Sequence, residues 1–282
     1  MKKAKKGTLN LTQKNVQKNG PKPKQPSASN HTVHALQQVI GNAQVGQLIQ
    51  REEIKSAIGY MGLNPKAYRE LNALKRYSKD IVLGSLDDSL QEKNYQTTED
   101  VIAFVYRGLG ISPFDIVTFF DAIECMLACD VAFREQMADM MRMFQAAQAG
   151  QFKLERLVLS GHHSGGEMWG ETADDERLSS FVPERDLANL AKTFPKAAAQ
   201  IQDVMFSACN TREQVALCQR LFPNLQSVWA YEGFSPSIDQ GSARHIKKWE
   251  KTTREEDVPA KKDEMGNTLV WSREDDFLVE FE

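Results

Sequence analysis

Three short apolar segments in the second half of the chain constrain the fold most. They span residues 154–160, 204–208 and 225–231. The residues between them, 184–200 and 211–222, carry apolar side chains at helical spacing, and Pro195 is expected to divide the first of these two helices. Strands that alternate with helices in this way predict βαβ units and a mostly parallel sheet flanked by helices, which is an α/β fold.

The rest of the chain divides by its composition. Residues 35–112 are expected to be mainly helical, with one strand near residues 80–85. Residues 113–252 form the predicted α/β domain, which begins with two strong helical patterns before the first strand. Residues 253–282 form a charged C-terminal extension that is expected to fold onto the body.

The N-terminus carries a strong charge asymmetry. The first 35 residues hold eight Lys and no acid, whereas the remainder holds 27 basic and 38 acidic residues, so a +8 segment precedes a −11 body. Residues 1–34 are also poor in apolar side chains, which predicts a disordered basic tail. The tail is either a solvated segment or a handle for packaging and export. It has no Arg and no interleaved aromatic residues, so nucleic-acid binding is not expected.

Composition and hydropathy also indicate in which cellular compartment the chain folds. No apolar stretch follows the Lys residues after Met1, so we expect no secretory signal peptide. The most apolar stretch, residues 111–133, contains four acidic residues, and we therefore expect no membrane span. Four Cys in 282 residues are too few for a disulfide scaffold, which favours folding in the reducing cytoplasm of the producing cell.

Two of the predicted strands end in residues that suit nucleophilic catalysis. His162 and His163 follow the first strand, and Cys209 follows the second. Because the carboxyl ends of parallel strands meet at one edge of a sheet, an imidazole and the Cys209 thiol are expected to face one cleft. A thiolate with a neighbouring imidazole is equipped for acyl transfer. Cys209 is also expected to open the following helix and to gain from its N-terminal dipole.

Other interpretations of the same residues remain open at this point. A single Cys at a strand end is often a buried apolar residue, and a His pair in a glycine-rich loop is often a solvated turn. The chain has no CxxC pair and no HExxH, so no standard zinc site, other metal or cofactor is expected. A metal-dependent hydrolase that uses His162 and His163 is kept as an alternative.

The sequences Ser160-Gly-His162 and Ser207-Ala-Cys-Asn-Thr211 resemble two motifs of the caspase-like (clan CD) cysteine peptidases. This group contains caspases, separases, gingipains, legumains and bacterial CHAT-domain peptidases. The resemblance covers about residues 131–252 and implies a caspase-like fold and a hydrolase that cleaves protein or peptide substrates. It implies Cys209 as the nucleophile and His162 as the general acid. The backbone N–H groups of His163 and Cys209 would then form the oxyanion hole.

One residue departs from the family pattern. The family usually has Gly after the catalytic His, whereas this chain has His163. A side chain at this position would crowd the oxyanion site, and it also leaves open which imidazole acts. The departure therefore motivates the alternative of a catalytically inactive caspase-like adaptor or interaction module.

The resemblance also points to a substrate-binding region. In this family the pocket for the residue before the scissile bond is built partly from the strand and loop after the Cys strand. Here that loop contains Glu232 and Asp239, whose carboxylates would pair with a basic substrate residue or would remain solvated. Trp169 is a candidate cleft wall. These residues predict a preference for a basic residue before the scissile bond.

A second, shorter resemblance concerns delivery. Residues 34–51 resemble the short stretch near the N-terminus of many cargo proteins of bacterial extracellular contractile injection systems. The resemblance implies a bacterial effector or toxin whose N-terminal region contacts a secretion or injection apparatus. Such a protein would be made in the cytoplasm and exported as cargo.

Overall fold

A computed structural model describes most of the chain beyond residue 53. The described residues are 54–64, 67–86, 95–171, 177–236, 241–254, 267–274 and 278–280. The predicted basic tail and the cargo-like segment at residues 34–51 lie outside them. Contacts divide the chain into residues 1–52 and residues 53–282, and every described residue belongs to the second unit. No helix in the described ranges is long and apolar enough to cross a membrane.

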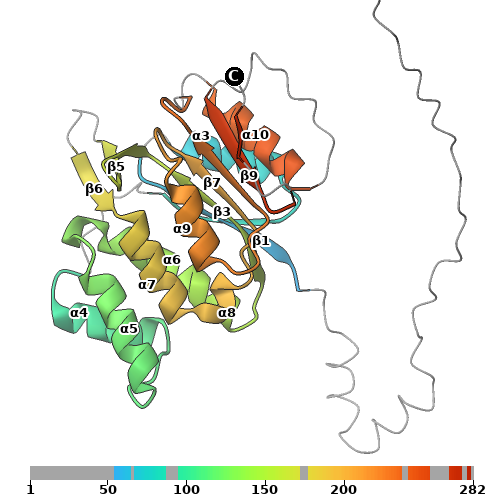
Figure 1. Cartoon of the computed structure of the whole chain (residues 1–282). Helices are drawn as coiled ribbons and strands as arrows, with labels where there is room; N and C mark the ends of the chain where they lie inside the picture. Colours follow the sequence, from blue (N-terminus) through green and yellow to red (C-terminus); the bar gives the residue numbers. More distant parts are fainter. Residues whose placement is uncertain are drawn as a thin grey trace, which may run out of the picture. The chain divides into compact units, whose positions relative to one another are not determined.

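A seven-stranded sheet forms the centre of this unit (Figure 1). Its strands in chain order are β1 (Ser56–Gly62), β2 (Ile81–Leu86), β3 (Lys153–Ser160), β7 (Asp203–Ser207), β8 (Ser227–Tyr231), β9 (Thr268–Ser272) and β10 (Leu278–Glu280). Their spatial order is β10-β9-β8-β7-β3-β1-β2. The five strands from β2 to β8 are parallel, and β9 and β10 extend the β8 edge in antiparallel pairing. The predicted α/β fold with a mostly parallel sheet is therefore confirmed.

Helices cover both faces of the sheet (Figure 1). One face carries α3 (Tyr68–Tyr77) and α10 (Ser242–Thr252), which contact each other. The other helical elements are α4 (Thr98–Ala103), the π-helical η2 (Phe104–Gly108), α5 (Ile116–Leu127), the 3-10 helix η3 (Val131–Phe133), α6 (Arg134–Gln148), α7 (Pro183–Thr193), α8 (Pro195–Ala198) and α9 (Gln214–Leu221). Of these, α6, α8 and α9 contact strands of the sheet, and α7 contacts α5, α8 and α9. Pro195 separates α7 from α8, as predicted.

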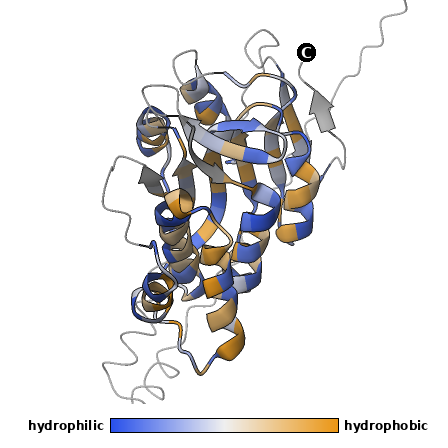
Figure 2. Cartoon of the chain, turned by 90° about the vertical axis from the view of Figure 1, so that its left-hand side faces the viewer, coloured by the Kyte–Doolittle hydropathy of each residue, from blue (hydrophilic) through white to orange (hydrophobic). Residues whose placement is uncertain are grey.

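The strands are buried on both sides because each face of the sheet has its own apolar core. In β7, Val204 and Phe206 belong to the larger core, which also contains residues of α5 to α9. Met205, between them, belongs to the smaller core with Ile246 and Trp249 of α10. Successive side chains of a strand point to opposite faces, so one short apolar run supplies both cores. Figure 2 shows the matching pattern in the helices, which carry both hydrophilic and hydrophobic residues.

The N-terminal part of this unit differs from the sequence prediction. Residues 52–112 were expected to be mainly helical apart from one strand, but β1 is a second strand and lies between β2 and β3. Six of its seven residues are buried, so its sequence has no polar alternation, and a short apolar run does not distinguish strand from helix. Because β1 and β2 share the sheet with β3, the boundary placed at residue 112 falls inside one unit.

A small antiparallel sheet follows β3 where a loop and a polar connection were expected. It consists of β4 (His162–Ser164), β5 (Glu167–Glu171) and β6 (Arg177–Phe181). Gly165 and Gly166 have φ values of 60° and 82°. Two consecutive residues with positive φ form the tight turn that joins hairpin strands, which explains why β4 and β5 pair directly.

Candidate active site

The two predicted motifs meet at the carboxyl edge of the sheet. Strands β3 and β7 are parallel neighbours, and their last residues, Ser160 and Ser207, are register partners. The N–H of Gly161 donates to the carbonyl of Ser207 at 3.3 Å, which extends this pairing by one residue. His162 and Cys209 each follow two residues after the serine partners. The fold therefore brings both motifs to the same edge, where parallel α/β sheets commonly place their ligands.

Glycine is required between Ser160 and His162. A Cβ atom at Gly161 would lie 2.9 Å from the backbone oxygen of Trp169 and 3.2 Å from the side chain of Leu63. The close approach of β5 therefore leaves no room for a larger residue in the first motif. The same approach brings Trp169 next to the histidines.

Cys209 differs from the other three cysteines in its exposure. Cys125, Cys129 and Cys218 are buried, whereas Cys209 is partly exposed. Burial raises the thiol pKa of each of the three buried cysteines, and the charge of Asp186 adds to this effect at the first two. They are therefore poor nucleophiles. Cys209 is the thiol that a substrate can reach.

The segment after β8 supplies polar contacts to the Cys209 sulfur. The N–H of Ser235 donates to Sγ at 3.4 Å, and the Ser235 hydroxyl oxygen lies 3.6 Å from it. The neighbouring Phe234 is 83% exposed, so an aromatic ring stands in solvent next to this position.

The turn that carries Cys209 is fixed by two hydrogen bonds. Asn210 has a φ of 52°, a left-handed conformation that Asn adopts more readily than most residues. Its N–H donates to the Gly233 carbonyl at 2.8 Å. In return, the N–H of Gly233 donates to the Asn210 side-chain oxygen at 3.1 Å. The loops after β7 and β8 are thereby joined directly beside the thiol.

The prediction that Cys209 opens a helix is wrong. Helix α9 begins at Gln214, with Glu213 as its N-cap, so four residues lie between Cys209 and the first residue of the helix. The field of a helix terminus falls off within about one turn. The α9 dipole therefore does not account for activation of Cys209.

His163 is buried, and both of its ring nitrogens have partners. Its Nδ1 lies 3.0 Å from the backbone oxygen of Cys209, and because a carbonyl only accepts, Nδ1 carries the proton. Its Nε2 lies 3.4 Å from the side-chain nitrogen of Gln214, which donates to it. The Glu213 carboxylate, 3.6 Å from Nε2, would pair with the ring only if it were protonated.

His162 lies on the other side of β4 and is only partly buried. Its ring stacks on Trp169, with centroids 5.9 Å apart and planes 25° apart. Neighbouring residues in a strand point to opposite faces, so His162 faces away from the partners of His163. Trp169 therefore contacts the predicted general acid and holds its ring.

The hairpin also determines the direction of the His163 N–H group. In a hairpin closed by two residues, Ser164 and Glu167 form the hydrogen-bonded pair next to the turn. The next pair, His163 with Met168, is then a non-hydrogen-bonded pair, and its N–H points away from β5. The N–H of Gly161 points to β7, and the period of two places the His163 N–H on that same side. This is the side on which Cys209 follows its strand.

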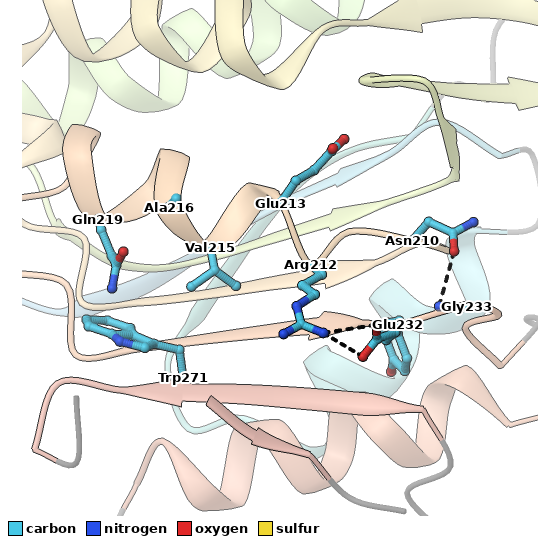
Figure 3. Close-up of a pocket in the computed structure, with 10 residues that line it drawn as sticks. Asn210, Arg212, Glu213, Val215, Ala216, Gln219, Glu232, Gly233 and Trp271 are labelled. Carbon is cyan, nitrogen blue, oxygen red and sulfur yellow. Dashed lines mark hydrogen bonds and ion pairs between the residues drawn. The ribbon is translucent and has the colours of Figure 1, made fainter. Parts of the chain in front are cut away.

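Glu232 lies in an open groove that also includes Asn210, the residue after Cys209 (Figure 3). Both of its carboxylate oxygens are 2.9 Å from Nη1 of Arg212. The groove has a volume of about 680 Å³ and is lined by Asn210, Arg212, Glu213, Val215, Ala216, Gln219, Tyr231, Glu232, Gly233 and Trp271. Glu232 thus already has a cationic partner within the chain. Asp239, the second acid predicted to bind substrate, lies outside the described residues.

Two residues at this edge were not found from the sequence. Ser235 contacts the sulfur, and Gln214 fixes the ring of His163. Each acts through a loop or a helix end, and neither carries a spacing signal in the sequence. Within the described ranges, no group of three or more His, Cys, Asp or Glu residues is arranged to hold a metal ion.

Comparisons with known proteins do not assign the chain to a family. No protein-family model matches the sequence, and no curated protein matches it.

Proposed function

We propose that the protein is a caspase-like cysteine endopeptidase that cleaves protein substrates with Cys209 and His162. One observation carries the proposal. The paired strand ends Ser160 and Ser207 place His162 and Cys209 at equivalent positions beyond two neighbouring parallel strands. The partial exposure of Cys209, unlike the other three cysteines, supports the same assignment.

The residues support a two-step acyl transfer. The Cys209 thiolate attacks the carbonyl carbon of the scissile bond, and the carbonyl oxygen becomes an oxyanion that the N–H groups of Cys209 and His163 stabilise. The intermediate collapses as His162 protonates the leaving amine, which breaks the C–N bond and leaves a thioester. Water then attacks the thioester, His162 accepts its proton, and the carboxylate product and free Cys209 are released.

The hydrogen bonds separate the roles of the two imidazoles. His163 uses one ring nitrogen on the Cys209 carbonyl and the other on Gln214, so it has no nitrogen left for proton transfer. His162 is partly exposed and is held by Trp169. We therefore assign proton transfer to His162 and the placement of Cys209 to His163.

Cleavage of a protein substrate by three variants tests the proposal. Cys209→Ala and His162→Ala should each lower kcat/KM by at least about a thousandfold, because each removes a reacting group. Cys218→Ala is the matched control, because it removes a buried thiol from α9 and should leave kcat/KM within about threefold. Full activity of Cys209→Ala would contradict the proposal.

The proposed preference for a basic substrate residue rests on Glu232 and Asp239. Because Glu232 is bound by Arg212, a substrate cation would have to compete with this arginine. A peptide-library cleavage profile of the wild type, Glu232→Gln and Arg212→Gln measures this effect. If Glu232 selects basic residues, Glu232→Gln weakens the preference and Arg212→Gln strengthens it. A profile that is identical in all three proteins would exclude Glu232 as a determinant.

The departure at His163 favours one second candidate, an inactive caspase-like adaptor. A peptide with an electrophilic carbonyl group distinguishes the two functions, because an adaptor would not form a Cys209 adduct that depends on His162. The proposed metal-dependent hydrolase would lose activity on addition of a chelator, whereas a cysteine peptidase would not.

Delivery as a bacterial effector or toxin is a separate proposal. Its support is the resemblance of residues 34–51 to cargo segments and the excess of Lys that precedes them. Removal of residues 1–51 should abolish loading into an injection apparatus and leave peptide cleavage unchanged. Equal loading of the full and shortened chains would contradict it.

A further inference from the structure

A buried carboxylate lies directly below the strand ends that carry the candidate site. Glu70, in the first turn of α3, is 1% exposed. Tyr60 of β1 is fully buried and donates its hydroxyl to Oε2 of Glu70 at 3.0 Å. Its hydroxyl also lies 3.1 Å from the Ala67 carbonyl.

The pair reaches both catalytic motifs through their serines. The Ser207 hydroxyl donates to Oε1 of Glu70 at 3.1 Å. Ser160 lies next to Tyr60 and is the register partner of Ser207. Two consecutive hydrogen bonds, Tyr60 to Glu70 and Ser207 to Glu70, therefore link β1 to the last residue of β7 across the sheet face that α3 covers.

A carboxylate in this position is costly unless it is compensated. Moving a charged group out of water requires several kcal/mol unless partners replace the lost hydration. Within the described part of the chain, both hydrogen-bond partners of Glu70 are hydroxyl groups. Burial and the Glu70 charge raise the pKa of Tyr60 well above its ordinary value, so its hydroxyl stays protonated and continues to donate. The stability of the fold alone does not explain why a carboxylate is buried between two hydroxyl groups.

The short spacing between each serine and the reacting residue of its motif suggests what the network does. Ser160 is two residues before His162, and Ser207 is two residues before Cys209. A displacement of either serine would be transmitted along a single short segment to a reacting group. Misplacement of a reacting group by about 1 Å lowers a rate by about a hundredfold.

We propose that Tyr60 and Glu70 are positioning residues that hold His162 and Cys209 in register through Ser160 and Ser207. The inference rests on the proposed cysteine peptidase function and extends it to the opposite side of the sheet. It also accounts for the serine in each motif as the contact point of this network.

Two single-atom deletions and one matched control test the inference in the full chain. Tyr60→Phe and Ser207→Ala each remove one hydroxyl of the network. Ser227→Ala removes an equivalent bond at the opposite edge of the sheet, where the Ser227 hydroxyl donates to the buried Asp203 at 2.6 Å. Peptide cleavage gives kcat and KM, iodoacetamide alkylation gives the reactivity of Cys209 without substrate, and near-ultraviolet circular dichroism reports folding.

Positioning predicts a specific set of results. In both variants kcat should fall about 10- to 100-fold while KM changes less than about twofold, and alkylation of Cys209 should slow. The double variant should lose no more than the worse single variant, because both deletions break the same chain of bonds. Ser227→Ala should retain the wild-type kcat and alkylation rate.

Three results would overturn the inference. One is that the folded Tyr60→Phe and Ser207→Ala proteins have the same kcat as Ser227→Ala. Another is additive losses in the double variant. A third is a change of substrate preference with unchanged alkylation of Cys209, which would make Glu70 a specificity residue. Failure of the peptidase proposal itself is recognised separately, because activity would then persist in Cys209→Ala.

Discussion

Substitutions of His163 separate a structural imidazole from a catalytic one. The ring is 4% exposed and fills two hydrogen bonds, to the Cys209 carbonyl and to the Gln214 side chain. His163→Ala leaves the partly buried carbonyl of Cys209 without its donor, which costs about 1–3 kcal/mol. The lost burial of the ring adds about 1–2 kcal/mol. We therefore expect the free energy of unfolding to fall by about 2–5 kcal/mol.

The same substitution should affect catalysis less than removal of His162. Without the Nδ1–H donor the Cys209 backbone is less well fixed, and kcat should fall about tenfold. His162→Ala should lower kcat by at least about a thousandfold and lower the stability by less than about 1.5 kcal/mol, because its ring is only partly buried. His163→Asn keeps a donor near the Nδ1 position and should recover part of the lost stability.

Urea unfolding and peptide cleavage of the three variants measure both effects. The ratio of activity loss to stability loss is the informative quantity, because it should be large for His162→Ala and small for His163→Ala. The assignment would be refuted if His163→Ala were inactive but as stable as the wild type while His162→Ala stayed active.

Three further predictions concern stability. Burial raises the pKa of Asp203 to about 6, so the folded state binds its proton more tightly than the unfolded state and this group's contribution to stability falls as pH rises from about 4 to 6. In urea titrations, the free energy of unfolding of Asp203→Asn should therefore exceed that of the wild type by up to about 3 kcal/mol at pH 7 and by almost nothing at pH 4. An equal increase at both pH values would contradict this prediction. Arg156→Met should lower the free energy of unfolding by about 1.5–3 kcal/mol in urea at pH 7, because Asp80 and Glu250 lose one of their two arginine partners and keep only Arg254, and an unchanged midpoint would count against it. Asn210→Ala should be about 1 kcal/mol less stable than Asn210→Gly in thermal unfolding, because only Gly tolerates the φ of 52° without strain, and equal midpoints would argue against strain at this turn.

The strands of the second half were predictable because their apolar runs are short and bounded. The observed β3, β7 and β8 begin and end within two residues of the predicted segments. β1 was missed because it is buried along almost its whole length, which removes the polar alternation that marks a strand. The hairpin of β4 and β5 was missed although Gly165 and Gly166 supply the turn signal.

The candidate site was only partly visible in the sequence for a related reason. His162 and Cys209 each follow a recognisable apolar strand, so their order and spacing can be read from the sequence alone. The partners of His163 and the pairing of Glu232 with Arg212 depend on where loops and helix ends pack. Glu70 is 137 residues from Ser207 in the chain, and only the folded sheet brings the two together.

Covalent labelling of Cys209 tests the central claim most directly. The wild type, His162→Ala and His163→Ala are incubated with a peptide that carries an electrophilic carbonyl group, and mass spectrometry locates the adduct. We predict an adduct on Cys209 in the wild type, a slower reaction in His163→Ala and almost none in His162→Ala. The absence of an adduct on wild-type Cys209, or equal labelling in His162→Ala, would contradict the assignment of these residues as a catalytic pair.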